Sequence, residues 1–466
     1  MTLLLQAAPL LLLAALLAAR TGPVPAVAVA IAIALPAAWI SLPAATGLPA
    51  FLVDELPRAL WLAFIPIAVV SGGLAFHEGV SARRAAGATV ADNDPLFTAA
   101  FLLGPFAESV TGFGVGMVFA LGAARRAGVR GAPAVALALF ALVLIPWGGL
   151  GPGTVLGAAL AHVDAQAMTT RNAWYSAAWL LTLLPLFWRI AAAAGQPVPA
   201  ARRAGHLVWV AALGVVLIAS HAVFPFEIAG IVATGPLLVL RLARITDLRS
   251  PGARQAAWHA ARPYVGLTVA LLATKLWASP PTFTPFPGLL PLPLTHAAVV
   301  LWAAALVLMA GPGCARRLGA VLRRAAWPAL TILLYVVLAR LMAGSGASAG
   351  LATAFAAAFG AAAPYASPLL AAIGGLVAGT NVGSNATMMP VQMELGRIAA
   401  LPETLLPAVQ NFAGSASCLL APQVLGIAAA LAPPDDRPLT SELWRLMWPA
   451  VPAAVIIGFA AVALGS

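Results

Sequence analysis

Glu108-Ser109-Val110-Thr111-Gly112-Phe113-Gly114-Val115-Gly116 is a polar, glycine-rich stretch inside an otherwise apolar part of the chain. A second stretch of this kind, Gly379-Thr380-Asn381-Val382-Gly383-Ser384-Asn385-Ala386-Thr387, lies far downstream. Hydrocarbon cannot satisfy an interrupted backbone, so such stretches occur at membrane depth only where protein or a water-filled cavity surrounds them. The two stretches therefore predict a path for a polar molecule through a membrane.

The composition also indicates a membrane protein. Of 466 residues, 62% are hydrophobic and 8% are charged, and the mean hydropathy is +0.98. Apolar runs of about 17–25 residues, long enough to cross a bilayer as helices, recur along the whole chain. This excludes a soluble fold and predicts an all-α, polytopic membrane protein with about 12–14 transmembrane helices. Spans are expected near 2–19, 24–40, 57–76, 132–160, 173–194, 207–224, 227–243, 263–279, 294–311, 327–343, 348–363, 404–432 and 444–464, with polar-centred segments at 95–122 and 368–393.

The first apolar run, 2–19, has no charged leader and no convincing cleavage site, so we interpret it as a retained span; a cleaved signal peptide is the alternative. The net charge of +11 would suggest nucleic acid in a soluble chain. Here the arginines lie in short loops between spans, as expected for cytoplasmic loops, and no nucleic-acid partner is predicted.

Cysteines and histidines give no metal motif. Cys314 and Cys418 are far apart and have no metal-ligand spacing around them, which argues against a disulfide framework or a zinc site. Four histidines near span ends have no partner that the sequence identifies: His206, His221, His259 and His296. We expect no metal and no other cofactor.

The segment 95–122 has basic loops on both sides. A single crossing would place these loops on opposite faces of the membrane, whereas a re-entrant hairpin keeps both in the cytoplasm. We therefore predict two half-helices that turn around Ser109 to Gly116. The alternative is one tilted span with a basic loop outside.

The interruptions are repeated in pattern. The first is followed by a broken span at Pro146-Trp147-Gly148-Gly149-Leu150-Gly151-Pro152-Gly153-Thr154, and the second by Gln410-Asn411-Phe412-Ala413-Gly414-Ser415-Ala416-Ser417. Paired, interrupted segments at corresponding positions indicate a transporter built from two repeats. We predict one domain, 1–466, with approximate repeats 24–243 and 263–464. The expected spans put both hairpins on the cytoplasmic side, whereas inverted repeats need opposite sides, so one intervening span is expected to be an interfacial helix or a missed pair.

At these residues the chain resembles the L-lactate permease family. Glu108-x-x-x-Gly112-Phe113-Gly114 is similar to that family's E-G-A-A-G-F-G, and the stretch from Gly379 to Ala386 is similar to its G-S-D-T-S-S-N-A. Ala413-Gly414-Ser415 through Ala421-Pro422-Gln423 resembles a later stretch that ends in S-P-Q. The resemblance implies a bacterial inner-membrane permease for lactate and glycolate that works by proton symport. The turn Ser384-Asn385-Ala386-Thr387 also resembles the hairpin tips of carboxylate symporters, which implies an elevator-like scaffold plus transport domain.

The chain departs from the family pattern at two positions. Asn381 stands where the family has an acid, and an amide can hydrogen-bond but cannot titrate. Val115 follows the Gly-Phe-Gly where the family usually has a Thr-Pro pair. Either coupling does not depend on the missing acid, or this protein differs in its substrate or ion.

The residue types at the interruptions suit a small carboxylate. Helix N-termini offer backbone N–H groups and a favourable dipole, and glycines allow close backbone approach. Hydroxyl and amide side chains add hydrogen bonds without a permanent charge that would trap the anion. The candidate substrate-binding residues are Ser109, Thr111, Gly112, Gly114, Asn381, Ser384, Asn385, Thr387, Asn411 and Ser415.

Two charged residues are candidates for coupling and charge pairing. Glu108 lies halfway along an apolar segment, where an ionised acid is costly, so it can carry a proton in one conformation and lose it in another. The alternative is a protonated strut that is hydrogen-bonded to the hairpin. Lys275 could pair with a substrate carboxylate, but a lysine near a span end beside Trp277 more often extends to the interface.

Three functional classes are open to such a protein: a secondary transporter, a channel and a membrane enzyme. A channel would show repeated pore-lining motifs or charged rings, an enzyme would show a catalytic constellation, and transport driven by ATP would need a phosphate-binding loop. The sequence has none of these patterns, whereas paired breaks and an intramembrane acid favour a secondary transporter. We therefore predict proton-coupled symport of L-lactate or a similar 2-hydroxy monocarboxylate, with a sodium-coupled carboxylate symporter as the alternative. The expected partners are the monocarboxylate, the proton and the lipid bilayer, and a homodimer is left open.

Overall fold

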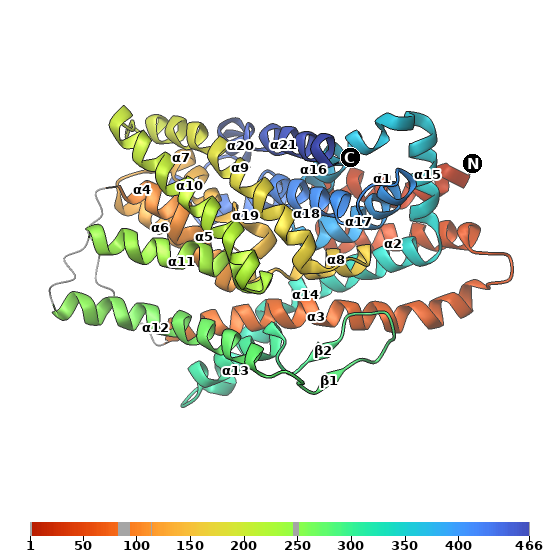
Figure 1. Ribbon diagram of the computed structural model, residues 1–466, viewed down its shortest axis with the longest axis horizontal. Helices are drawn as coiled ribbons and strands as arrows, with labels where there is room; N and C mark the ends of the chain where they lie inside the picture. Colours follow the sequence, from red (N-terminus) through yellow and green to blue (C-terminus); the bar gives the residue numbers. More distant parts are fainter. Residues whose placement is uncertain (1, 83–93, 113, 246–250, 466) are drawn as a thin grey trace.

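The computed structural model describes residues 2–82, 94–112, 114–245 and 251–465. Within these ranges nearly every regular element is a helix, and the longer helices run along the long axis of the molecule (Figure 1). One antiparallel pair of two-residue strands is present, β1 (Thr282–Phe283) and β2 (Leu292–Pro293). The α-helices are α1 (Thr2–Ala18), α2 (Pro23–Ser41), α3 (Leu48–Ala82), α4 (Pro95–Thr98), α5 (Gly104–Thr111), α6 (Val115–Arg126), α7 (Gly131–Leu139), α8 (Pro152–Ala161), α9 (Ala165–Ala193), α10 (Ala200–Val223), α11 (Phe226–Ile245), α12 (Pro251–Ala273), α13 (Ala297–Met309), α14 (Cys314–Gly344), α15 (Ala347–Phe359), α16 (Ser367–Ala378), α17 (Asn381–Ile398), α18 (Leu405–Cys418), α19 (Pro422–Ala430), α20 (Thr440–Met447) and α21 (Ala450–Gly465). A π-helix, η1 (Ala99–Leu103), and five short 3₁₀ segments complete the set: η2 (Phe140–Leu142), η3 (Ile145–Leu150), η4 (Thr274–Leu276), η5 (Gly360–Ala366) and η6 (Pro434–Asp436).

The helices confirm the predicted all-α membrane class. In the described part of the chain, seven helical segments are long and apolar enough to cross a bilayer, or up to nine if two bent pairs each count as one span. Five further apolar helices are shorter than 18 residues. One of the seven segments, Ala347–Ala378, is interrupted at Gly360, where φ is +53°. The chain is thus a multi-pass membrane protein.

Helix α3 is longer than the sequence indicated. It has 35 residues, whereas a span at 57–76 was expected. Glu55 lies before the expected span and is paired in the structure: Arg340 of α14 donates from Nε and Nη2 to the two carboxylate oxygens of Glu55, at 2.7 and 2.8 Å. This two-pronged ion pair ties α3 to α14 and lets α3 continue beyond its apolar core.

The segment after residue 94 forms the predicted hairpin. Helix α6 packs back against η1 and α5 instead of continuing their direction. The chain reverses at Gly112 and Gly114, whose φ angles are +69° and +79°, values that side-chain-bearing residues rarely adopt. Phe113 lies outside the described residues. The glycines therefore give the reversal its geometry.

The second polar stretch forms a second hairpin, α16 and α17. Helix α16 ends at Gly379, where φ is +63°. The hydroxyl oxygen of Thr380 then accepts a hydrogen bond from the backbone N–H of Gly383 at 3.0 Å, which caps the first turn of α17. The buried face of α17 carries the polar side chains of this stretch.

One of the two predicted breaks is correct and the other is misplaced. The first occurs as expected, because Gly148 and Gly149 in η3 have non-helical backbone angles. The second was predicted at 410–417, but these residues lie inside helix α18. The chain bends by 43° between α18 and α19, immediately before Pro422, because proline removes a backbone donor and disfavours a helical residue before it.

The two hairpins enter the molecule from opposite ends. Gln196, after the end of α9, donates to the carbonyl of Ala127, at the end of the first hairpin, at 2.7 Å. Arg171, near the start of α9, donates to Thr404, just beyond the second hairpin, at 2.9 Å. Helix α9 has 29 residues and is about 43 Å long, so the hairpin bases lie at opposite ends of it.

This corrects the expectation that both hairpins share a side. The predicted span 348–363 accounts for the difference. It forms α15 and η5, and α15 runs across the direction of its neighbours at one end of the molecule (Figure 1). Its 13 residues make it too short to span a bilayer. When this segment is not counted as a span, the number of spans between the two hairpins is odd. An odd number places the two hairpins on opposite sides of the membrane, as inverted repeats require.

Helices α16 and α18 touch at small residues, which yields a first prediction. A Cβ on Gly375 would collide with the carbonyl oxygen of Gly414 and lie 3.0 Å from Ser417 Cβ. Gly375→Val is therefore expected to destabilise the protein by about 2 kcal/mol or more, since rigid backbone must move. Thermal unfolding in detergent measures this loss. Gly426→Ala is the control, because nothing lies within 4 Å of a Cβ at that helical position, and an unchanged melting temperature for Gly375→Val would contradict the packing.

Candidate functional site

The broken segment 145–154 lies between the two hairpin tips and touches both. A Cβ on Gly149 would lie 3.0 Å from the Cα atom of Gly112, at the first tip. A Cβ on Gly153 would lie 2.8 Å from both the Cβ of Asn381 and the backbone nitrogen of Val382, at the second tip. The absence of side chains at these glycines brings three interrupted backbones together inside the helical bundle.

The second tip contributes to a buried amide cluster centred on Asn411. The Oδ1 atom of Asn411 accepts hydrogen bonds from Nδ2 of Asn385 at 2.8 Å and from Nδ2 of Asn381 at 3.1 Å. Its Nδ2 atom donates to Oδ1 of Asn172 at 2.7 Å and to the hydroxyl of Thr154 at 3.1 Å. These five side chains, which we call the amide cluster, join α17, α18, α8 and α9. Three of them were predicted as site residues, and the structure brings these three together.

Glu108 is bound within its own hairpin. Its two carboxylate oxygens accept hydrogen bonds from the backbone N–H groups of Gly114 and Gly116, both at 3.1 Å. The side chain is 5% exposed. An anionic carboxylate stabilises the free N–H groups and the positive dipole of the first turn of α6. Glu108 thus caps the first turn of α6, as Thr380 caps the first turn of α17.

The predicted hydroxyl side chains are buried but lie outside the amide cluster. Thr111 donates to the carbonyl of Ala107, Thr387 to that of Gly383 and Ser415 to that of Asn411. Ser384 accepts a hydrogen bond from Gln410 at 3.0 Å. Ser109 faces α11, where a Cβ on Gly230 would lie 2.7 Å from its hydroxyl oxygen. Among the described residues no hydrogen bond joins Glu108 or Ser109 to the second hairpin; the two tips are linked through the broken segment.

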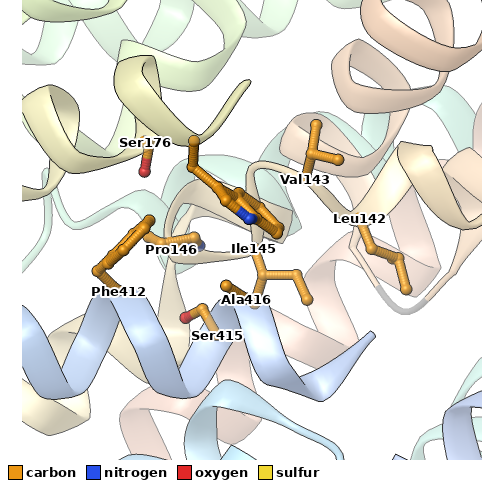
Figure 2. A pocket seen from close by; sticks show the side chains of 9 residues that line it. Leu142, Val143, Ile145, Pro146, Ser176, Phe412, Ser415 and Ala416 are labelled. Atoms are coloured by element: carbon orange, nitrogen blue, oxygen red, sulfur yellow. The ribbon is translucent and has the colours of Figure 1, made fainter. Parts of the chain in front are cut away.

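Figure 2 shows a small gap between the broken segment, α18 and α9. Pro146 and Ile145 line it from the broken segment, Phe412 and Ser415 from α18, and Ser176 from α9 (Figure 2). Phe412 follows Asn411 directly, Ser415 lies one turn beyond Asn411, and Ser176 lies one turn from Asn172. The gap has essentially no space for a water molecule, so its side chains are packed and leave no room for a ligand there.

Lys275 lies in η4, and its side chain is outside the described part of the structure. Trp147, in the broken segment, donates from its indole N–H to Nε2 of His221 at 3.2 Å. The tryptophan is fully buried and packs against α10.

Two cluster members were missed by sequence reasoning. Thr154 closes the first broken stretch, and Asn172 comes immediately before the predicted span 173–194. In the structure α9 begins at Ala165, so Asn172 is helical and fully buried. An asparagine one residue outside an apolar run was the available signal.

The structure gives His206 partners that the sequence did not identify. Its Nε2 atom lies 2.6 Å from a carboxylate oxygen of Asp94, and its Nδ1 accepts from the indole of Trp188 at 3.1 Å. Arg241 lies 3.5 Å from the same oxygen of Asp94. His221 and His296 also have partners, Trp147 and the N–H of Ala298. Asp94 lies at the base of the first hairpin, so this charged group anchors that hairpin to α10 and α11.

Part of the chain matches a known protein family. Residues 294–434 match the family model for L-lactate permease. This confirms the resemblance predicted from the motifs over just under a third of the chain. The matched L-lactate permease segment contains the second hairpin and α18, and thus Asn381, Asn385 and Asn411. Glu108, Thr154 and Asn172 lie outside it.

The comparison with solved structures gives a similarity of low identity. The chain is similar to the Alcanivorax borkumensis YdaH transporter, whose crystal structure is described as having an unusual topology. The identity is 15%, the TM-score is 0.46, and the match covers 89% of this chain and 86% of that chain. No curated protein matches the chain.

Proposed function

We propose that the protein is a secondary transporter that carries L-lactate or a similar small 2-hydroxy monocarboxylate across the cytoplasmic membrane together with a proton. The observation that carries this proposal is that both hairpin tips contact one broken segment and that the amide cluster is buried at the second of these contacts. Interrupted backbone at this depth is characteristic of transporter substrate sites. The L-lactate permease match of the segment that holds the second tip supports a monocarboxylate as the substrate.

Glu108 would carry the proton in this scheme, because its two hydrogen bonds depend on whether its carboxyl group is ionised or protonated. An ionised carboxylate accepts from Gly114 and Gly116 with both oxygens. A protonated carboxyl has a weaker acceptor at its O–H oxygen, so one backbone N–H is released. A substrate carboxylate can then take that donor. Protonation and anion binding would thereby favour one another at the first tip.

The movement that exposes the site would be elevator-like. Helices α8, α9, α17 and α18 share the amide cluster and would move as a unit, whereas α3 and α14 are held together by the Glu55–Arg340 pair. Arg125 and Arg241 lie at the end where the first hairpin has its base. By the positive-inside rule this end would face the cytoplasm. The approximate repeats 24–243 and 263–464 remain our proposal for the internal symmetry.

Uptake into proteoliposomes tests the function. Purified protein is expected to accumulate radiolabelled L-lactate above equilibrium when an inward proton gradient is imposed in sodium-free buffer. A protonophore is expected to abolish the accumulation, because the gradient is its only driving force. Protein-free liposomes are the control. Uptake that requires sodium and ignores the proton gradient would instead establish the sodium-coupled alternative, and no uptake by folded protein would refute the proposal.

A further inference from the structure

The amide cluster has a fixed orientation of donors and acceptors that can be traced from two backbone carbonyls. The carbonyl of Ala408 can only accept, so the atom of Asn172 that contacts it at 2.6 Å is Nδ2. Oδ1 of Asn172 therefore faces Asn411 and accepts from its Nδ2. This leaves Oδ1 of Asn411 turned toward the second hairpin.

The other end of the cluster gives the same orientation. Asn385 contacts the carbonyl of Gly153 at 2.9 Å, again an acceptor, so Nδ2 of Asn385 donates both there and to Asn411. Nδ2 of Asn381 donates to the same Asn411 oxygen. Turning any one of these amides would place two acceptors or two donors in contact. The network permits one arrangement.

That arrangement leaves two buried acceptors without donors. Among the described residues, no donor reaches Oδ1 of Asn381 or Oδ1 of Asn385. The two side chains are 7% and 0% exposed. An unsatisfied buried carbonyl oxygen costs about 1–3 kcal/mol, so a ligand that supplies a hydrogen there gains this energy. The sequence had suggested donors for the carboxylate at these positions, whereas both N–H groups of Asn385 are already used.

We propose, on the basis of the proposed function, that Oδ1 of Asn381 and Oδ1 of Asn385 accept the hydrogen of the substrate's 2-hydroxyl group and so select 2-hydroxy acids. A carboxylate oxygen would meet two acceptors and be repelled, so the carboxylate lies toward the N–H groups of the first tip. A hard cation would need about six oxygen ligands, and Asn411 Oδ1 is already occupied by donors. A hydroxyl needs only one or two acceptors.

Three ligands of nearly equal size test the assignment. L-Lactate carries the 2-hydroxyl, propionate has hydrogen in its place, and pyruvate has a ketone that can only accept. Competition against radiolabelled L-lactate on purified protein in sodium-free buffer measures the relative affinities. We expect L-lactate to bind about 30-fold more tightly than propionate or pyruvate, because sites built for a hydroxyl reject analogues that lack it.

Variants of Asn381 test whether its amide oxygen causes the preference for L-lactate over propionate and pyruvate. Asn381→Leu removes the acceptor and is expected to reduce the 30-fold preference to about 3-fold, mainly by weakening lactate binding. Asn381→Asp in its protonated form can donate to Oδ1 of Asn411 as the amide does and keeps an acceptor oxygen, so at low pH it is expected to retain the preference. Gln392→Leu is the matched control, because the oxygen of Gln392 is also buried and unpartnered but lies two helical turns beyond Asn385.

The outcomes separate this inference from the proposed function. Wild-type protein that binds lactate and propionate equally overturns the hydroxyl assignment and leaves lactate transport intact. An unchanged preference in Asn381→Leu, or lactate binding that appears only with added sodium, also overturns it. Folded wild-type protein that binds none of the three acids refutes the function and the inference together. If Asn381→Leu fails to fold, the wild-type ligand series and Asn381→Asp still decide.

Discussion

Glu108→Gln is expected to reduce proton-driven accumulation of lactate by about tenfold or more. Glutamine cannot exchange a proton, so the imposed gradient has no group to act on at the first tip. Its amide nitrogen also meets a backbone N–H where the carboxylate accepted a bond, so one of the two contacts with Gly114 and Gly116 is lost. Uptake under an inward proton gradient is the measurement, with lactate counterflow measured in parallel.

Counterflow separates coupling from folding. Exchange of lactate across the membrane needs no net proton movement, so Glu108→Gln is expected to keep a larger share of exchange than of accumulation. Glu227→Gln, an acid-to-amide change in the first turn of α11, is the control and is expected to keep both. Accumulation by Glu108→Gln at the wild-type level would show that Glu108 is a structural cap alone.

Asn411→Ala is expected to have the largest effect on stability. The substitution removes the hub of the amide cluster and leaves its partners on Asn172, Asn381 and Asn385 without their hydrogen bonds. Hydrogen bonds within membrane proteins average about 0.6 kcal/mol and reach about 1.7, so the loss of the hub is expected to cost about 3 kcal/mol. Thermal unfolding of the purified protein in detergent measures it.

Ser417 provides the matched control for this loss. It lies on the same helix and is fully buried, and its hydroxyl has no partner among the described residues. Ser417→Ala therefore removes a polar atom without breaking a bond and is expected to change stability by less than about 0.5 kcal/mol. Similar melting temperatures for the two variants would mean that the hub bonds contribute nothing.

The sequence predicted what local chemistry determines. The reversal at Gly112 and Gly114 and the break at Gly148 and Gly149 follow from residues that the backbone requires at those points. The all-α membrane class follows from composition. The misplaced second break shows the limit of this approach, because Gly414 and Ser415 were interpreted as helix interruptions, whereas Gly414 provides close packing against Gly375.

The pairing of residues distant in sequence could not be predicted. Asn172 and Asn411 are 239 positions apart, and Asp94 and His206 are 112 apart, so no spacing rule connects them. The sidedness of the hairpins depended on α15, whose 13 mostly apolar residues resemble part of a span, whereas the helix runs across the direction of its neighbours. Several polar residues near span ends have buried partners from distant parts of the chain, which the sequence could not identify.

The contacts of Gly149 with Gly112 and of Gly153 with Asn381 make the broken segment a mechanical link between the two halves of the chain. Neither tip can shift alone unless backbone slides over backbone at these points. Because the two glycines carry no side chains, movement of the tips against the broken segment meets little steric resistance. A methyl group added at either glycine would collide with the facing residue and hinder this movement, so transport is expected to fail although all ligand-binding atoms are unchanged.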